Sequence, residues 1–488
     1  MTERDRLDRA QIDLGDMDEQ DFRRAAGQVA DRVADYLAHV ERYRVVPDIE
    51  PGDVRARIPA APPEEPEPWD AILADYATLI EPNITHWQHP GYMAYFCSTA
   101  PGPGVLGEWL AAGLNSNVMF WRNAPASTEL EEVVVAWLRQ MLGLPGAFDG
   151  MFTDTASVSS LLSIVAARHV VPGLDARERG LAGRDDIGPL RMYLSDEAHS
   201  SIEKAAIVAG VGRAGVRRIP TDDAFRMRPD ALAEAVAEDR AQGFTPFCVV
   251  ATLGTTSSTS VDPAGPIADV CERERLWLHI DAAYAGAAAL LPERRGLFEG
   301  WERADSIVVN PHKWLMTPFD ASLLLFRRPE VYRDALSLVP EYLRTNVRGQ
   351  VHDFHEYGIQ LGRRFRALKL WIMIRYFGVE GFRRRLRESI RHADTLAGWV
   401  EAEPGWRLVA PHPFSTLCIR HEPDGLDAEA TDAHNARILE TVNRDGRIFL
   451  SHTKLRGRYV IRVTFGNPRC TMRHVELCWH LLRDAANA

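Results

Sequence analysis

A lysine beside a histidine follows a short apolar run near the middle of the chain. The run Ile307–Val309 ends in Asn-Pro, and His312 and Lys313 stand directly before Trp314. Such a run is typical of a buried strand in a parallel sheet, and in open α/β sheets the ligand crevice lies outside the carboxyl ends of the strands. Most lysines are surface charges, but a lysine held in a dry pocket can act as a nucleophile. The stretch alone leaves both interpretations open.

Three further stretches place polar groups after apolar runs. Asp281, in LHIDAAYAG, could bind a metal, act as a general base or pair with a cationic ring nitrogen. His199, in SDEAHSS, could stack on a planar ring or be structural. The segment FTDTASVSS (152–160) precedes a helical pattern and offers hydroxyls, backbone N–H groups and the positive end of a helix dipole. It is either a phosphate site or ordinary N-capping by Thr155 or Ser157.

An amine, a carboxylate and a phosphate site at the strand ends of one sheet suit pyridoxal 5'-phosphate (PLP). In this interpretation Lys313 forms the Schiff base, and Asp281 keeps the pyridinium nitrogen protonated. The cofactor then serves as an electron sink for a carbanion at the substrate Cα.

The elements that must position these residues alternate between strand and helix. Such alternation favours an α/β fold with a mostly parallel sheet and helices on both faces. The expected strands are 150–153, 192–194, 216–219, 247–252, 276–280, 307–309 and 322–326. The expected helices between them are 157–168, 201–209, 229–242 and 267–275. A helix over 128–142, entered through a capping arrangement at Ser127, precedes the first strand.

The two ends of the chain differ from this centre. Helical spacing predicts helices over 18–39 and 69–80, separated by the Pro-rich connector 59–68. Helical patterns over 363–376 and 381–401 precede a smaller α+β region. Its strands are expected near 407–409, 416–420, 448–451 and 459–463. We therefore expect a helical arm over 1–85, a large domain over 86–385 and a small α+β domain over 386–488.

Composition restricts the possible partners. The 488 residues carry a net charge of −11, which disfavours nucleic acid and anionic membranes. No apolar run approaches the roughly 20 residues that span a bilayer. Six scattered cysteines without a CxxC pair suggest reduced, mostly buried thiols and a cytoplasmic protein. HWQH (86–89) and HDFH (352–355) have no further ligand signal, so we expect no metal site.

Several long motifs together resemble one family, the group II PLP-dependent decarboxylases, and are nearest to the aromatic L-amino-acid decarboxylases. They are HWQHPGYMAYF (86–96), PASTELE (125–131), DEAHSSIEKA (196–205), ATLGTT (251–256), WLHIDAAYAG (277–286), NPHKWL (310–315) and LGRRFRALKLW (361–371). The resemblance implies PLP fold type I, a small amino-acid substrate and a homodimer with active sites at the interface. It also implies that the N-terminal arm wraps the partner subunit.

The resemblance also implies roles for single residues. Lys313 would be the Schiff-base lysine, Asp281 the partner of the pyridine nitrogen, and His199 the residue stacked on the cofactor ring. Phosphate contacts would come from Ala156, Ser157, Asn310 and His312, and ring contacts from Thr252 and Ala283. Trp87, Phe96 and Ser98 match positions that line the substrate pocket, while Asn117 and Met119 lie on a segment that reaches into the neighbouring active site.

One expected feature departs from the family. In the decarboxylases a mobile loop brings to the cofactor a tyrosine that helps to protonate Cα. Counting back from LGRRFR, the matching position is Phe354, which cannot donate a proton. In plant and insect relatives, loss of this tyrosine accompanies aldehyde synthases, which use O2 and release aldehyde, CO2, ammonia and hydrogen peroxide. Tyr357 or His355 could replace the missing group.

The substrate and the reaction class also stay open. Asn117 and Met119 replace apolar residues, and Arg122 stands where a small residue is usual. A polar wall could bind a ring hydroxyl or an indole N–H, or could mark a non-aromatic substrate, and Arg122 could instead pair with an acid at the interface. The main expectation is decarboxylation of an aromatic L-amino acid. The alternatives are the aldehyde synthase reaction, an aminotransferase, and a PLP-binding homologue without turnover.

Overall fold

The chain divides into two compact units, Met1–His89 and Pro90–Ala488, in a computed structural model that describes residues 16–338 and 351–488. The first unit is helical. Its α2 (Glu19–Ala38) begins at Asp18, whose side chain accepts hydrogen bonds from two backbone N–H groups. The short helices α3 (Asp53–Arg57) and α4 (Trp69–Asp75) follow, and the π-helical turn Tyr76–Ile80 continues α4. The connector 59–68 holds no helix or strand, as its prolines predicted.

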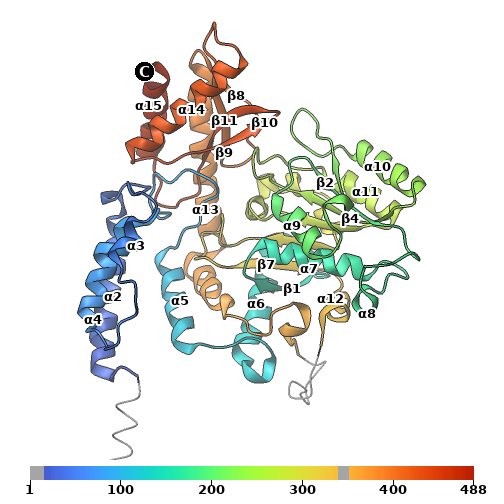
Figure 1. The fold of residues 1–488 in the computed structure, drawn as a ribbon, viewed down its shortest axis with the longest axis horizontal. Helices are drawn as coiled ribbons and strands as arrows, with labels where there is room; N and C mark the ends of the chain where they lie inside the picture. The colour runs from blue at the N-terminus through green and yellow to red at the C-terminus, as the bar shows by residue number, and fades with distance from the viewer. Residues whose placement is uncertain (1–15, 339–350) are drawn as a thin grey trace, which may run out of the picture. The chain divides into compact units, whose positions relative to one another are not determined.

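The second unit is built on a seven-stranded sheet in the order β1-β7-β6-β5-β4-β2-β3. Figure 1 labels its strands β1, β7, β4 and β2. Its strands are β1 (Asp149–Thr153), β2 (Leu190–Ser195), β3 (Val216–Ile219), β4 (Thr245–Thr252), β5 (Trp277–Asp281), β6 (Ser306–Val309) and β7 (Ser322–Phe326). The pairs from β3 to β6 are parallel, and β7 runs antiparallel to both of its neighbours. The prediction of a mostly parallel α/β sheet is confirmed.

The helices between the strands lie where the apolar periodicity predicted them. They are α7 (Ala156–His169), α9 (Ser200–Val208), α10 (Pro229–Ala241) and α11 (Ala264–Glu274), with α8 (Ala176–Arg179) and α12 (Pro329–Leu336) beside them. Every residue of β5, β6 and β7 is buried, which explains why these strands appear in the sequence as continuous apolar runs. Because these strands are buried, polar side chains at their carboxyl ends have well-defined positions.

Two helices that precede β1 in the sequence differ from the sequence prediction. The structure contains α5 (Gly102–Leu114), which the sequence did not predict. α6 (Pro125–Met141) begins at a proline, and no side chain caps it, so the predicted capping by Ser127 is wrong. Proline at the first helical position needs no hydrogen-bond acceptor for its nitrogen and already has a helical φ.

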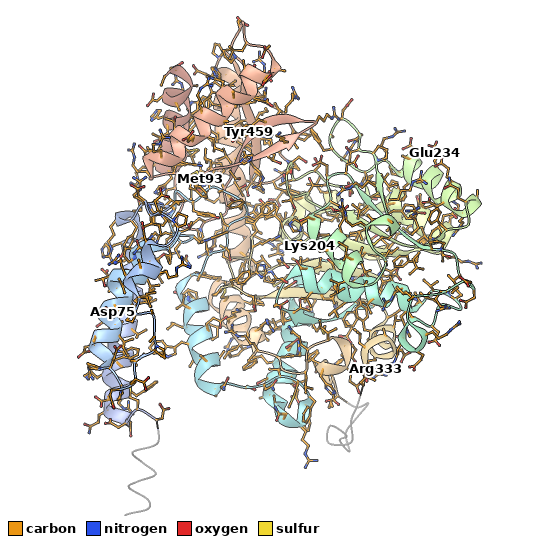
Figure 2. The ribbon with its side chains drawn as sticks, viewed as in Figure 1. Asp75, Met93, Lys204, Glu234, Arg333 and Tyr459 are labelled. Carbon is orange, nitrogen blue, oxygen red and sulfur yellow. The ribbon has the colours of Figure 1, made fainter. Side chains whose placement is uncertain are left out.

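The C-terminal part contains α13 (Arg366–Ala402), interrupted at Gly378, and a second sheet in the order β10-β11-β9-β8. Its strands are β8 (Trp406–Leu408), β9 (Thr416–His421), β10 (Ser451–Leu455) and β11 (Arg458–Thr464), with the helices α14 (Ala428–Asp445) and α15 (Met472–Asn487). Met93 and Tyr459 belong to this region in Figure 2, and Met93 is part of its apolar core. The small-domain boundary at 385/386 falls inside α13 and stays a prediction.

One strand of this sheet corrects the sequence prediction. The apolar stretch 448–451 was expected as a strand, but Phe449 forms only a single bridge with Tyr92. The strand is the next segment, β10, which alternates between buried and exposed residues. That alternation is typical of a strand at the edge of a sheet, and the polar residues SHTKL concealed it.

All six cysteines are free and buried. Within the described part of the chain, no helix is long and apolar enough to cross a membrane. No group of three or more His, Cys, Asp or Glu residues in residues 16–338 and 351–488 could hold a metal ion.

Candidate active site

A cavity of about 250 Å³ lies at the carboxyl ends of β4, β5 and β6, beside the start of α7. It is lined by Phe96, Thr155, Ala156, Ser157, His199, Ser201, Thr252, Gly254, Thr256, Asp281, Ala283, Tyr284, Asn310, His312 and Lys313. Because parallel strands bring their carboxyl ends to one edge, four stretches that are distant in sequence meet here.

Lys313 is the central cation of this cavity. It follows β6 in a turn closed by a hydrogen bond of 3.0 Å from its backbone N–H to the Asn310 carbonyl. The next residue, Trp314, is buried and stacks on Tyr284 at 4.9 Å, which anchors the turn. Burial lowers the pKa of Lys313, while the charge of Asp281 opposes this change and that of Arg462 adds to it. The lysine is therefore more readily available as a neutral nucleophile than a surface lysine.

Asp281 ends β5 between two neighbouring strands. It is aligned with Thr252 of β4 and Val308 of β6, and its Oδ1 accepts a hydrogen bond of 3.1 Å from the Ala283 N–H. The side chain is 6% exposed. A buried carboxylate at this position can hold a proton on a cationic ring nitrogen.

His199 caps α9 and is exposed at the edge of the cavity. The Ser201 backbone N–H donates to its Nδ1 at 3.2 Å, so a neutral His199 carries its proton on Nε2. Partial burial lowers the pKa of His199, Asp281 opposes this effect, and Lys313 adds to it. The ring is therefore a neutral plane with one remaining N–H donor.

The start of α7 provides donors for an anion. Thr155 precedes the helix in an extended conformation and makes no side-chain cap, so the predicted alternative of ordinary N-capping is not what the structure shows. The first N–H groups of a helix, here those of Ala156 and Ser157, have no acceptor within the helix. His312 lines the same cavity and accepts the Ala321 N–H at Nδ1, 3.0 Å away. Burial lowers the pKa of His312 to about 3, so it is a neutral Nε2–H donor.

The residues present fit PLP. Within residues 16–338 and 351–488, the Thr252 hydroxyl and the Asn310 side-chain carbonyl are buried without a hydrogen-bond partner. Both line the cavity, where buried polar groups without partners indicate a ligand. The same cavity combines an amine, a carboxylate and the donors of a helix start, which are the groups that a phosphorylated pyridine aldehyde requires.

Every residue predicted to contact the cofactor lines this cavity, as does Phe96 from the predicted substrate pocket. In the described part of the chain, Ser98, Asn117 and Met119 do not line it. Trp87 belongs to the first unit. The individual roles of all these residues stay predictions.

The structure corrects the prediction that Phe354 occupies the position of the catalytic loop tyrosine. Phe354 lies in the 3-10 helix Phe354–Tyr357, is 2% exposed, and belongs to the main apolar core. The guanidinium of Arg363 lies 4.5 Å from its ring centroid, and the ring lines a separate small cavity with Met151 and Leu162. A ring buried in this way cannot contact a cofactor in its own chain or in a second copy without leaving the core. Tyr357 is buried as well, so it is not a loop donor either.

Sequence reasoning missed Thr155, Ser201, Gly254, Thr256 and Tyr284 as lining residues. It also missed Arg462 of β11, which lies 4.5 Å from the Phe96 ring centroid. Its Nη1 donates to the Tyr95 carbonyl at 2.6 Å, whereas its buried Nη2 has no hydrogen-bond partner among the described residues. A charged residue at the fifth position of the apolar strand RYVIRVT was the one available signal.

Comparison with known proteins supports the chemistry of the cavity. The family profile described as "Pyridoxal-dependent decarboxylase conserved domain" matches residues 51–422. Tyrosine decarboxylase 4 of Petroselinum crispum is 38% identical over 493 residues, which cover 98% of this chain and 96% of that protein.

Two solved structures are similar over nearly their whole length. The crystal structure of Oryza sativa TDC with PLP and tryptamine has a TM-score of 0.93 and 33% identity, covering 97% of this chain and 99% of that one. The Rhodiola rosea 4-hydroxyphenylacetaldehyde synthase has a TM-score of 0.88 and 32% identity, covering 96% and 99%. The expected fold type I is confirmed, and the cofactor is pyridoxal 5'-phosphate. With its cavity, its sheet and its relatives in agreement, the chain belongs to the pyridoxal-dependent decarboxylase family.

Proposed function

We propose that the chain decarboxylates an aromatic L-amino acid to the corresponding amine. The observation that carries this proposal is the juxtaposition of Lys313, Asp281 and the start of α7 around one cavity. The choice of an aromatic substrate is supported by relatives named for tyrosine and tryptophan decarboxylation and by a similar structure that holds tryptamine.

PLP, when bound, supplies the electron sink that accepts the bonding electrons as CO2 leaves Cα. Lys313 holds the cofactor covalently and moves protons at its Nζ. Asp281 holds the proton on the ring nitrogen, and the backbone amides of Ala156 and Ser157 bind the phosphate with the Nε2–H of His312. His199, which lines the same cavity, is assigned to stack on the cofactor ring.

We assign the substrate wall to Trp87, Phe96, Ser98, Asn117 and Met119, with the last two acting in a second copy of the chain. This assignment makes the active unit a homodimer. The Asn117 side chain accepts the Arg363 backbone N–H at 2.9 Å, so its amide nitrogen is the group left to recognise a ring substituent. Its Nδ2 approaches the Met119 sulfur at 3.6 Å, which joins the two wall residues into one surface.

The aldehyde synthase reaction is the second candidate, because a 4-hydroxyphenylacetaldehyde synthase is among the similar structures. Its sequence argument rested on Phe354, and the burial of that ring removes the argument. The segment 339–350, outside the described residues, contains one tyrosine, Tyr342. We propose that Tyr342, rather than Phe354, matches the loop tyrosine of the decarboxylases, which favours the amine as product.

The test supplies L-tyrosine, L-DOPA, L-tryptophan and L-phenylalanine under air and measures CO2, amine, aldehyde and peroxide together. We expect CO2 and amine in equal amounts without oxygen uptake. Aldehyde with stoichiometric peroxide would instead establish the synthase reaction. A dependence of product formation on a 2-oxo acid would establish an aminotransferase, and bound PLP without CO2 release would identify a homologue without turnover.

Two variants sharpen this test. Tyr342→Phe should divert product from amine to aldehyde and peroxide if Tyr342 protonates Cα. Lys313→Ala should abolish the absorbance band of the lysine Schiff base. A retained band in Lys313→Ala would refute the assignment of this lysine.

A further inference from the structure

The helix α7 is fixed to the sheet by buried hydroxyl groups. Ser159, Ser160 and Ser163 are all fully buried on the side of α7 that meets other elements. Ser159 bonds to Thr153 of β1 at 2.7 Å and to Ser322 of β7 at 3.0 Å. Apolar packing alone tolerates small sliding movements, whereas hydrogen bonds fix direction and distance. The position of the phosphate-binding end of α7 is therefore set by polar bonds.

His279 of β5 makes the central bond of this set. Its Nε2 lies 3.0 Å from the Ser160 hydroxyl of α7, and its Nδ1 lies 2.9 Å from the Ser306 hydroxyl of β6. Ser306 also accepts the indole N–H of Trp277 at 3.0 Å. Both ring nitrogens are thus used, and one imidazole joins β5 and α7, which carry cavity residues, to β6, which leads into Asn310.

The imidazole is neutral. Burial lowers the pKa of His279 to about 4, although the charge of Asp281 acts in the opposite direction. Because the Trp277 N–H occupies one acceptor site of Ser306, the Ser306 hydroxyl can donate to Nδ1. The Nε2–H then donates to Ser160. The bond between β5 and α7 is in this arrangement directional and uncharged.

The spacing of these residues relates the bond to the cavity. His279 and Asp281 are two positions apart on β5, so their side chains point to the same face of the sheet. Ser160 lies four residues, about 6 Å, along α7 from Ala156 at the start of the helix. Ser306 likewise precedes Asn310 by four residues. The contact between His279 and Ser160 is thus a short connection between the carboxylate end and the phosphate end of the cavity.

We propose that His279 is a positioning residue for PLP, and that its Nε2–Ser160 bond holds the start of α7 at the distance from Asp281 that the cofactor spans. The bond acts on cofactor binding without touching substrate. This inference rests on the cofactor of the proposed function and does not depend on which amino acid is decarboxylated.

The test compares His279→Gln with His279→Asn. Gln can place an amide near the position of Nε2 and keep the bond to Ser160, whereas Asn reaches only the position of Nδ1 and keeps the bond to Ser306. The measurement is the dissociation constant of PLP, obtained by titrating apoprotein and following Schiff-base absorbance. We expect His279→Asn and Ser160→Ala to weaken PLP binding about tenfold, and His279→Gln to stay within about twofold of the wild type.

Two controls separate positioning from general stability. Ser163→Ala removes a buried hydroxyl from the same helix, 3.0 Å from the Tyr332 hydroxyl, but three residues farther from the cavity. It should lower the melting temperature of the apoprotein as Ser160→Ala does, yet leave PLP affinity unchanged. The double variant Ser160→Ala/His279→Asn should bind PLP no more weakly than either single variant, because both remove one bond.

Equal losses in His279→Gln and His279→Asn, additive losses in the double variant, or an affinity loss in Ser163→Ala would each overturn the inference. All measurements use PLP without amino acid. A protein that binds PLP but fails to decarboxylate therefore refutes the proposed function and leaves this test intact.

Discussion

The pKa of the Lys313 amine is shifted by burial and by two charged neighbours that act in opposite directions. Burial and Arg462 favour the neutral amine, and Asp281 favours the ammonium. Arg462 is itself buried, and burial lowers its pKa, but guanidinium groups stay charged in proteins. Arg462 therefore acts on the lysine as a fixed positive charge, and both cations lie near the Phe96 ring.

Replacing Arg462 by Gln should slow capture of PLP by the apoprotein. Removal of a neighbouring cation stabilises the ammonium form and raises the pKa of Lys313, so less free amine is present at pH 7. We expect a severalfold slower Schiff-base formation at pH 7, with the rate recovering at higher pH. The measurement is the pH dependence of the stopped-flow absorbance change. Arg462→Lys keeps the charge and serves as the control, and an equal pH profile in both variants would contradict this role.

Phe354→Tyr should affect stability and leave chemistry unchanged. The ring is buried in the core, so an added hydroxyl loses its water without a prepared partner. We expect the free energy of unfolding to fall by about 1–3 kcal/mol and the ratio of amine to aldehyde to stay constant. Urea denaturation and product analysis check the two parts. A changed product ratio would mean that this ring reaches the cofactor after all.

The sequence could predict that the proposed cofactor residues line one cavity, because each ends or follows a buried strand or begins a helix, and these patterns are local. Asp281 and Lys313 illustrate this, since Asp281 ends the strand that precedes DAAYAG and Lys313 lies in the polar turn that follows the run Ile307–Val309. Phe354 could not be predicted in the same way. Counting back from LGRRFR assumes that the loop has the same length as in the family. In addition, the sequence alone does not distinguish an aromatic residue in a loop from one in the core. Arg462 was missed because its contact with Phe96 joins residues that lie far apart in the sequence, and local patterns do not reveal such a contact.

At the scale of elements, an ion pair joins β1, α6 and the start of α13. Arg363 donates to Glu131 at 2.5 Å and to the Phe152 carbonyl at 2.7 Å, and Glu131 accepts the Phe152 N–H at 2.9 Å. Arg363 also donates to the Val118 carbonyl at 2.9 Å, next to Asn117. One guanidinium thus fixes the end of β1, which leads into the predicted phosphate-binding segment, together with the segment of the predicted substrate wall.

Breaking this pair from one side should be costly. Glu131→Gln leaves the buried charge of Arg363 without a counter-ion, and we expect a loss of about 3–5 kcal/mol of unfolding free energy. Glu131→Met combined with Arg363→Met should lose less than the sum of the two single variants, because the uncompensated charge disappears. Urea midpoints of the wild type, Glu131→Met, Arg363→Met and the double variant measure the coupling. Additive losses would show that the two side chains act independently.

Most strands and helices could be predicted, because the helices repeat apolar residues at the helical period and the buried strands are short continuous apolar runs. The helix α5 could not, since its sequence GPGVLGEWLAAGL contains four glycines and a proline. The structure gives the reason for two of these glycines. A Cβ on Gly104 would lie 2.6 Å from the Pro318 side chain, and one on Gly107 would lie 2.6 Å from the Lys369 backbone. Glycine at these positions permits close packing of α5 and α13. Because glycine has a low helix propensity, the same residues predict a loop from the sequence alone.

At the scale of the whole molecule, α5 presents a row of exposed apolar side chains. Leu106, Leu110 and Leu114 are 57%, 58% and 67% exposed. A helix face of this kind usually marks an interaction site. It immediately precedes Asn117, the residue assigned to the neighbouring active site, which agrees with the homodimer that we propose.

Leu110→Lys should therefore weaken the dimer. We expect sedimentation of the wild type as a dimer at micromolar concentration and a shift of the variant towards monomer, with parallel loss of decarboxylation. Val208→Lys is the matched control, since Val208 is 70% exposed near the end of α9, away from this row. A dimer that persists in Leu110→Lys, or an equal effect of both variants, would place the interface elsewhere.

The buried cysteines have a practical consequence for such experiments. Burial raises the pKa of Cys97, Cys418 and Cys478 to about 12, and that of the other three thiols also lies above its ordinary value. Maleimide and iodoacetamide reagents attack thiolates that solvent can reach, so the native thiols should stay inert at pH 7. A single cysteine introduced at Val208, which is 70% exposed at the end of α9 and away from the proposed interface, would then accept one fluorophore or spin label in the otherwise unaltered chain. Energy transfer or dipolar spectroscopy between two labelled copies would report the distance across the dimer directly.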